Sequence, residues 1–217
     1  MNPAIRTVLF DLDGTIIDTN QLIIDSFMNT VTGSSLTRET IIPHMGTTLQ
    51  NQLRVFSGLD DVRELEQAYR AYNLAHHDSM VKPFPHVQQV IRDLHAAGIR
   101  LGVVTTKIRP TTMKVLEMFD LYRYMEAVVT VTDVTHPKPH AEPVRMALEK
   151  MGAEAKTALM VGDSPADIQS AQNAGVRAAA VAWSLKGEQE LSGYGPDHML
   201  HDMRDLYELT GTERREA

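Results

Sequence analysis

The chain contains no cysteine. This absence excludes a disulfide scaffold, a thiol nucleophile and a thiolate metal site. Long apolar runs are also absent: none approaches the roughly 20 residues that cross a membrane, and the first six residues, MNPAIR, do not resemble a signal peptide. Basic residues are outnumbered, with 21 Lys and Arg against 28 Asp and Glu and a net charge of −7. We therefore expect a cytoplasmic protein that binds neither membranes nor nucleic acid, because proteins that bind nucleic acid carry basic patches.

The 217 residues that are present suit one large domain or one domain with an insert. Apolar runs typical of strands alternate with amphipathic stretches typical of helices. The strand-like runs are residues 5–10, 100–105, 127–131, 157–161 and 177–182, and the helix-like stretches are residues 85–97, 110–119, 142–151 and 165–174. This alternation predicts an α/β fold with a Rossmann-like, doubly wound parallel sheet that is covered on both faces.

One interval, residues 16–81, interrupts the alternation. It contains no convincing strand, and its apolar residues, such as Leu22, Phe27 and Val31, are spaced as in helices. We predict a helical cap domain of residues 16–81, inserted after the first strand into a catalytic core of residues 1–15 plus 82–217. The two crossings, near residues 15–19 and 81–84, would then act as hinges. Length alone leaves open the alternative that these helices pack on one side of the same core.

The hexapeptide FDLDGT, residues 10–15, follows the first apolar strand directly. Residues two positions apart in an extended strand point the same way, so Asp11 and Asp13 can address one reaction centre. Gly14 then allows the chain to turn. Two carboxylates at one site either bind a metal or divide the acid and base roles between them.

Further polar residues stand where the later strands end, which is where doubly wound sheets bind their ligands. They are Thr105, Thr106 and Lys107 after the second core strand, Lys138 after the third, and Asp163 and Asp167 after the fourth. Ser164 before Pro165 predicts a helix N-cap. This set suits phosphoryl transfer, because a carboxylate can attack phosphorus, a second can move the proton, and a lysine and a hydroxyl can stabilise phosphate oxygens.

These motifs, in this order, resemble those of the haloacid dehalogenase superfamily of phosphohydrolases. The resemblance covers essentially the whole chain, including the inserted cap. It implies that Asp11 is the nucleophile and Asp13 the general acid/base, and that Thr105 and Lys138 complete the catalytic set. It further implies a substrate-binding set and a site for the cofactor Mg²⁺. The substrate-binding candidates are Thr105, Thr106, Lys107, Lys138 and Gly14, and the metal candidates are Asp11, Asp13, Asp163 and Asp167, with Asp167 in a supporting position.

Three comparisons within the superfamily narrow the reaction. Asp13 distinguishes the chain from the dehalogenases, which lack this second acid. The absence of lysine between Thr15 and Val81 removes the Schiff base of the phosphonate-cleaving members, and the absence of histidine at residues 18–24 disfavours the sugar-phosphate mutases. Hydrolysis is left. The cap and tail are most similar to inorganic pyrophosphatases; the alternatives are a phosphatase for phosphoglycolate or another small phosphomonoester, and a phosphate-binding module without catalysis.

The residues that determine substrate specificity are then expected on the cap, or on the core where the cap approaches it. Pyrophosphate needs cations around its distal phosphate, for which the candidates are Lys107, Arg109, Arg38, His44, Arg54, His76 and His77. For the adjacent histidines, a solvated helix face is favoured over substrate contact, because neighbours on a helix do not face each other. Residues 46–48 either reach the site or form a plain turn. We expect the small anionic substrate to be bound by a monomer.

Overall fold

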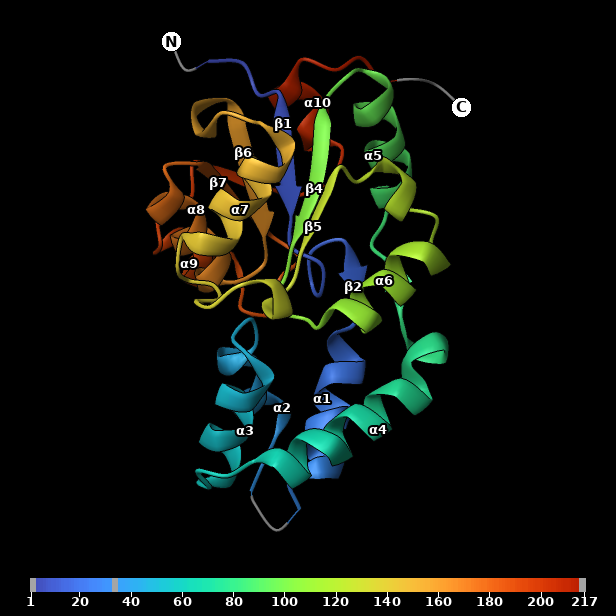
Figure 1. Ribbon diagram of the computed structural model, residues 1–217, viewed down its shortest axis with the longest axis vertical. Helices are drawn as coiled ribbons and strands as arrows, with labels where there is room; N and C mark the ends of the chain where they lie inside the picture. The colour runs from blue at the N-terminus through green and yellow to red at the C-terminus, as the bar shows by residue number, and fades with distance from the viewer. Residues whose placement is uncertain (1–2, 33–34, 215–217) are drawn as a thin grey trace.

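A six-stranded parallel sheet forms the centre of the computed structural model, which describes residues 3–32 and 35–214 (Figure 1). Its strands run in the spatial order β5-β4-β1-β6-β7-β8, and all the neighbouring pairs are parallel. Their bounds are β1 Thr7–Phe10, β4 Arg100–Val104, β5 Ala127–Val129, β6 Ala158–Gly162, β7 Arg177–Val181 and β8 His198–Leu200. The doubly wound α/β fold is thereby confirmed. The edge strand β8 was not predicted, because three residues give too short a pattern to distinguish a strand.

Helices cover both faces of the sheet, as Figure 1 shows. Strand residues alternate between two hydrophobic clusters: Val8 and Phe10 lie in one, and Leu9 lies in the other. The first cluster includes helices α5 (Val87–Ala96), α6 (Arg109–Met118) and α10 (Asp205–Thr210), and the second includes α7 (Glu142–Met151), α8 (Pro165–Ala174) and α9 (Glu188–Ser192). Short 3₁₀ turns occupy Tyr122–Tyr124, Val131–Asp133 and Ala155–Thr157.

The remaining helices lie beyond the carboxyl ends of the strands and form the lower part of the molecule in Figure 1. They are α1 (Asn20–Thr30), α2 (Arg38–Ile41), the 3₁₀ helix η1 (Ile42–His44), α3 (Leu49–Ser57) and α4 (Arg63–Met80). They enclose a hydrophobic cluster of their own, in which the ring of Phe27 lies 4.9 Å from that of Phe56 and 4.6 Å from that of Tyr69. A separate cluster is what an inserted cap requires, so we retain the division into a core and a cap of residues 16–81 as a proposal and call these helices the cap.

The two crossings between core and cap lie side by side. Strand β2 (Ile17–Asp18) pairs antiparallel with β3 (Lys82–Pro83), a two-stranded ribbon that the sequence did not reveal. Phe84 also donates its N–H to the carbonyl of Ile16 at 3.2 Å. Backbone hydrogen bonds therefore join the two chain crossings to each other, at the place where the predicted hinge would have to bend. Among the described residues, no helix is both long and apolar enough to span a membrane.

Candidate active site

The site begins where β1 ends. Asp11 continues the ladder, donating its N–H to the carbonyl of Val161 at 2.8 Å, and only 5% of the residue is exposed. Gly14 then turns the chain with a φ of 83°, a left-handed conformation that favours glycine. A Cβ at Gly14 would also collide with the carboxylate of Asp163. Glycine is therefore required here both for the turn and for the close approach of the segments that follow β1 and β6.

Lys138 lies at the centre of a buried network of charges. Its Nζ donates to Asp11 Oδ1 at 2.6 Å, to Asp167 Oδ1 at 2.5 Å and to the carbonyl of Val104 at 3.0 Å. These three acceptors use all the hydrogens of the ammonium group. Burial lowers the pKa of Lys138, but the carboxylates of Asp11 and Asp167 outweigh burial and hold this pKa above its ordinary value. The lysine is thus fixed in position and charged.

Asp167 joins this network to the start of α8. Its Oδ2 accepts hydrogen bonds from the backbone N–H of Ser164 at 3.0 Å and from the Ser164 hydroxyl at 2.6 Å. Ser164 is the N-cap of α8, as the sequence predicted, with Pro165 at the first helical position. Because both carboxylate oxygens of Asp167 already bind protein donors, its visible contribution is to hold Lys138 and the loop after β6 in place.

Asp163, at the end of β6, has a different environment. It is 7% exposed, and its carboxylate forms no hydrogen bond or ion pair with residues 3–32 or 35–214. Oxygen atoms of Asp11, Asp163 and Asp167 lie within 4.8 Å of one another. Burial raises the pKa of Asp163 well above its ordinary value, and the charge of Asp11 adds to the effect. Burial likewise raises the pKa of Asp11 to about 7, although Lys138 opposes it. A buried, unpaired carboxylate beside another suits a divalent cation with hard oxygen ligands.

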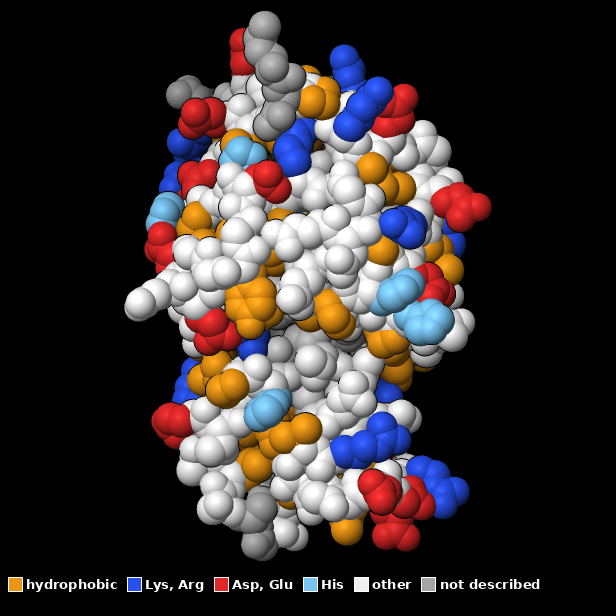
Figure 2. Space-filling view, turned by 90° about the vertical axis from the view of Figure 1, so that its left-hand side faces the viewer, with side chains coloured by type: hydrophobic (Ala, Val, Ile, Leu, Met, Phe, Trp, Pro, Cys, Tyr) orange, Lys and Arg blue, Asp and Glu red, His pale blue; other side chains and the backbone are white. Residues whose placement is uncertain are grey.

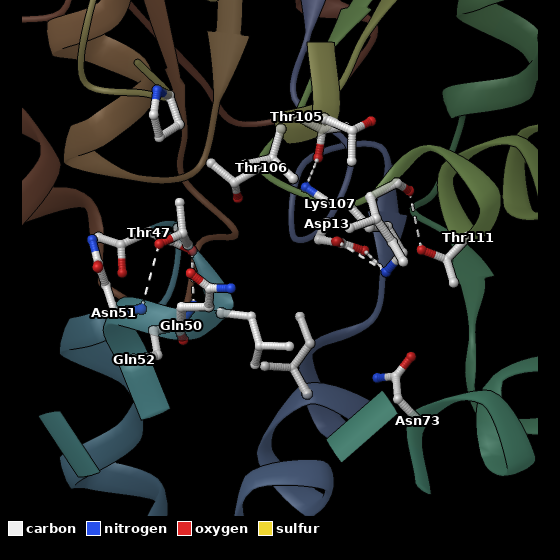
Figure 3. A pocket seen from close by; sticks show the side chains of 18 of the residues that line it. Asp13, Thr47, Gln50, Asn51, Gln52, Asn73, Thr105, Thr106, Lys107 and Thr111 are labelled. Atoms are coloured by element: carbon white, nitrogen blue, oxygen red, sulfur yellow. Dashed lines mark hydrogen bonds and ion pairs between the residues drawn. The ribbon is translucent and has the colours of Figure 1, made fainter. Parts of the chain in front are cut away.

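The second acid of the hexapeptide, Asp13, is held by a lysine that follows β4. Lys107 Nζ lies 3.1 Å from each carboxylate oxygen of Asp13, as the dashed lines in Figure 3 show. Its backbone N–H donates to Thr105 Oγ1, also at 3.1 Å. Thr105 is buried, and Thr106 lies beside it along the cavity wall (Figure 3). The residues that follow β1 and β4 therefore meet, as expected of strand ends that share one edge of a parallel sheet.

A cavity of about 960 Å³ lies between this edge of the sheet and the cap. Figure 2 shows that the molecule narrows at this level. The core lines the cavity with Asp11, Asp13, Thr105, Thr106, Lys107 and Asp163, and the cap lines it with residues of α1, α3, α4 and the loop of residues 46–48. That loop reaches the site, because a Cβ at Gly46 would lie 2.6 Å from the side chain of Ser164. The plain turn is thereby excluded.

Comparison with known proteins identifies the family. Residues 8–181 match the haloacid dehalogenase-like hydrolases. The chain belongs to this family. Its relatives include proteins named "Pyrophosphatase PpaX" from Bacillus cereus strain G9842, 44% identical, and from Anoxybacillus flavithermus, 42% identical; each alignment spans 97% of this chain and 99% of the relative. A similar solved structure is a putative haloacid dehalogenase-like hydrolase from Bacteroides fragilis, with a TM-score of 0.84 and 26% identity over 93% of this chain and 99% of that one.

The structure of this hydrolase places one of the seven candidate cations along the cavity. Lys107 lines the cavity, whereas Arg109, Arg38, His44, Arg54, His76 and His77 do not. Arg109 instead pairs with Asp133 at 2.7 Å. His77 is fully buried and its Nδ1 lies 2.9 Å from Asp78 Oδ1, so the expectation of a solvated face is wrong for His77 and holds for the exposed His76.

Two cations that line the cavity were missed. Arg70 of α4 lies 2.5 Å from Glu66, and Lys114 of α6 lies 2.7 Å from Asp78. One signal was available: Arg70, Asn73 and Leu74 have the i, i+3, i+4 spacing of a single helix face, and all three line the cavity. The direction of that face depends on how α4 packs, which local spacing does not reveal.

Proposed function

We propose that this hydrolase cleaves inorganic pyrophosphate into two phosphates through an aspartyl-phosphate on Asp11. One observation carries the proposal: the buried Asp11 carboxylate, bound by Lys138 at 2.6 Å, opens into the cavity between core and cap. Relatives 42–44% identical over nearly the whole chain are named pyrophosphatases, which supports this choice of substrate.

The residues present fit a Mg²⁺ ion. The Asp11 side chain, the Asp13 backbone carbonyl and Asp163 would hold it, and the unpaired, buried carboxylate of Asp163 is the observation that favours this assignment. Asp167 would support the ion through Lys138 and Ser164. When bound, Mg²⁺ would reduce the repulsion between the attacking carboxylate and the anionic phosphate.

The chain's own residues would divide the reaction into two steps. The Asp11 carboxylate attacks the phosphorus atom and forms an acyl phosphate while the bond to the bridging oxygen breaks. Asp13 gives its proton to the departing phosphate, and in the second step it takes a proton from the water that attacks the acyl phosphate. Lys107 orients Asp13 from 3.1 Å. Lys138 and the Thr105 hydroxyl stabilise the oxygens of the transferring group.

Pyrophosphate would extend from this centre toward the cap. Three cations, Lys107, Arg70 and Lys114, line the cavity. Each is now paired with a single carboxylate, that of Asp13, Glu66 or Asp78. A phosphate group carries more negative charge than one carboxylate and can compete for these donors. We assign the distal phosphate to Arg70 and Lys114, because Lys107 is needed to orient Asp13.

The size of the cavity favours a second candidate, hydrolysis of phosphoglycolate or another small phosphomonoester. A volume of about 960 Å³ exceeds the need of pyrophosphate. The apolar side chains of Ile23, Leu49 and Leu74 also line it, and pyrophosphate has no group to contact them. An organic leaving group would use this wall.

Phosphate release from pyrophosphate, phosphoglycolate and a sugar phosphate, each with Mg²⁺ or with a chelator, separates these candidates. We expect the highest kcat/KM for pyrophosphate and loss of turnover without Mg²⁺. A higher kcat/KM for phosphoglycolate would overturn the choice of substrate. The Asp11→Asn variant, purified in the same way, reports any contaminating phosphatase.

A further inference from the structure

Residue Lys186 of the core binds the cap. It follows β7, and its Nζ donates to the carbonyl oxygens of Ile42 at 2.8 Å and Pro43 at 3.0 Å, both in the 3₁₀ helix η1. The preceding side chain, Leu185, packs against the hydrophobic cluster of the cap. The main chain of this segment thus belongs to the core, while two of its side chains are attached to the other half of the molecule.

The same segment is also attached to the metal candidate Asp163. Ser184 Oγ donates to the backbone carbonyl of Asp163 at 2.6 Å, and the backbone N–H of Lys186 donates to Ser184 Oγ at 3.2 Å. Hydrogen bonds, together with the side chain of Lys186, therefore connect the loop after β6 to the carbonyl of Ile42 by way of Ser184. The position of the cap and that of the Asp163 loop are linked by direct contacts.

The two carbonyls lie just before the cap loop that reaches the site. Residues 46–48 follow η1 closely, and Gly46 fits against Ser164 with no room for a Cβ. A bond from Lys186 to η1 therefore fixes the base of this loop. Burial lowers the pKa of Lys186, in keeping with an ammonium group partly removed from water at the junction.

A second contact between core and cap differs in kind. Lys114 pairs with Asp78 at 2.7 Å, but their side chains are 37% and 59% exposed. Exposed ion pairs contribute little to stability, since water and salt screen them. Lys186 instead donates to two backbone carbonyls of η1, and that of Ile42 also accepts the N–H of Met45 at 3.1 Å, so the lysine binds a carbonyl that is already fixed within the cap.

We propose that Lys186 is a positioning residue that holds the cap, and with it the loop of residues 46–48, closed over Asp11 and Asp163. The structural part of this proposal concerns cap closure alone. Its kinetic part rests on the proposed hydrolysis of pyrophosphate.

The absence of native cysteine allows a direct measurement of closure. Spin labels on Glu64→Cys in the cap and Glu149→Cys in the core, both exposed positions, report the distance between the two parts by pulsed electron paramagnetic resonance. Without ligand, we expect Lys186→Met to raise the ratio of open to closed molecules roughly tenfold, as expected for the loss of hydrogen bonds from a charged donor. Leu185→Ala should shift the ratio in the same direction, and Lys186→Arg should restore closure.

The control is Lys156→Met, which removes an exposed lysine paired with Glu154, far from the cap. It should leave the distance distribution unchanged. An unchanged distribution in both Lys186→Met and Leu185→Ala would overturn the proposal, whatever the substrate proves to be. This outcome is distinct from the failure of the proposed function, which would appear as absent pyrophosphate turnover in the unmodified enzyme while the distance measurement remains valid.

Kinetics add a second readout. If Lys186 acts through closure, Lys186→Met should raise the KM for pyrophosphate several-fold while kcat stays within about twofold, because saturating substrate drives the cap shut again. A large loss of kcat with an unchanged distance distribution would contradict the proposal and place Lys186 in the chemistry itself.

Discussion

The edge of the sheet and the cap wall opposite it hold their charged side chains in different ways. On the core side, Lys138 is 4% exposed and uses all its donors within the protein. On the cap side, the Arg70 side chain is 36% exposed and is paired with Glu66 alone. We infer a division of labour: the buried network would be fixed in advance for the proposed chemistry, and the half-exposed Arg70 would remain free to exchange its partner for a substrate.

Removal of the centre of the buried network, Lys138, should have the largest effect. Lys138→Met should lower kcat by roughly a thousandfold, because the charge that stabilises the transferring phosphoryl group is lost. It should also destabilise the fold by about 3–5 kcal/mol, since Asp11 and Asp167 would be left buried without their partner. Steady-state kinetics and urea unfolding measure the two effects.

Lys150→Met, at the exposed end of α7, is the matched control and should change neither quantity appreciably. A Lys138→Met variant that retains most of its kcat would show that the network serves the fold and not the reaction.

The next largest effect is a dependence of the free energy of unfolding on pH, which arises from the buried carboxylates. Burial raises the pKa of Asp11 in the folded state to about 7 from an ordinary 3.8, so the folded protein binds a proton there more tightly than the unfolded chain. In the absence of divalent cations, the contribution of Asp11 to the free energy of unfolding should therefore be greatest below pH 4. This contribution should be lost as the pH rises to 7. The change is on the order of a few kcal/mol.

Asp11→Asn should remove much of this dependence, and Mg²⁺ should counteract it in the unmodified protein. The exposed Asp120→Asn serves as the control. Thermal unfolding between pH 4 and pH 8, with and without Mg²⁺, makes the test. If the stability of the unmodified protein rises steadily over this range without Mg²⁺, ionisation of the buried Asp11 does not destabilise the fold as we expect.

The smallest effect belongs to the cap. Arg70→Gln should raise the KM for pyrophosphate by roughly three- to tenfold and leave kcat within about twofold, as expected for the loss of one charged contact to the distal phosphate. Arg63→Gln on the same helix breaks an exposed pair with Asp61 and should alter neither constant. Equal kinetics for the two variants would remove Arg70 from the substrate site.

Much of the core could be predicted because its signals are local. Five strands of the main sheet are nearly continuous apolar runs, and the residues after four of them are brought together by the parallel topology alone. The elements that were missed are short or non-local. Strand β8 has three residues, and the ribbon of β2 and β3 joins segments that are far apart in the chain.

The cap was harder to predict for a related reason. Spacing reveals that a helix is amphipathic, but packing decides which polar residues face the cavity, so Arg70 of the cap was overlooked while His77 proved to be buried. Lys114 of the core helix α6 was overlooked for the same reason. The contact from Lys186 to Ile42 spans 144 positions in sequence. No local pattern announces such a contact, because its acceptors are backbone carbonyls that every residue possesses.

The proposed reaction requires Asp11 to form a covalent bond to phosphorus. Rapid acid quenching of the enzyme with radiolabelled pyrophosphate and Mg²⁺, followed by peptide mass spectrometry, tests it directly. We expect a phosphoryl group on the peptide that contains Asp11, formed as fast as turnover requires and absent from Asp11→Asn. A phosphoryl group on a different residue, or rapid turnover with no phosphorylated enzyme at any quench time, would contradict it.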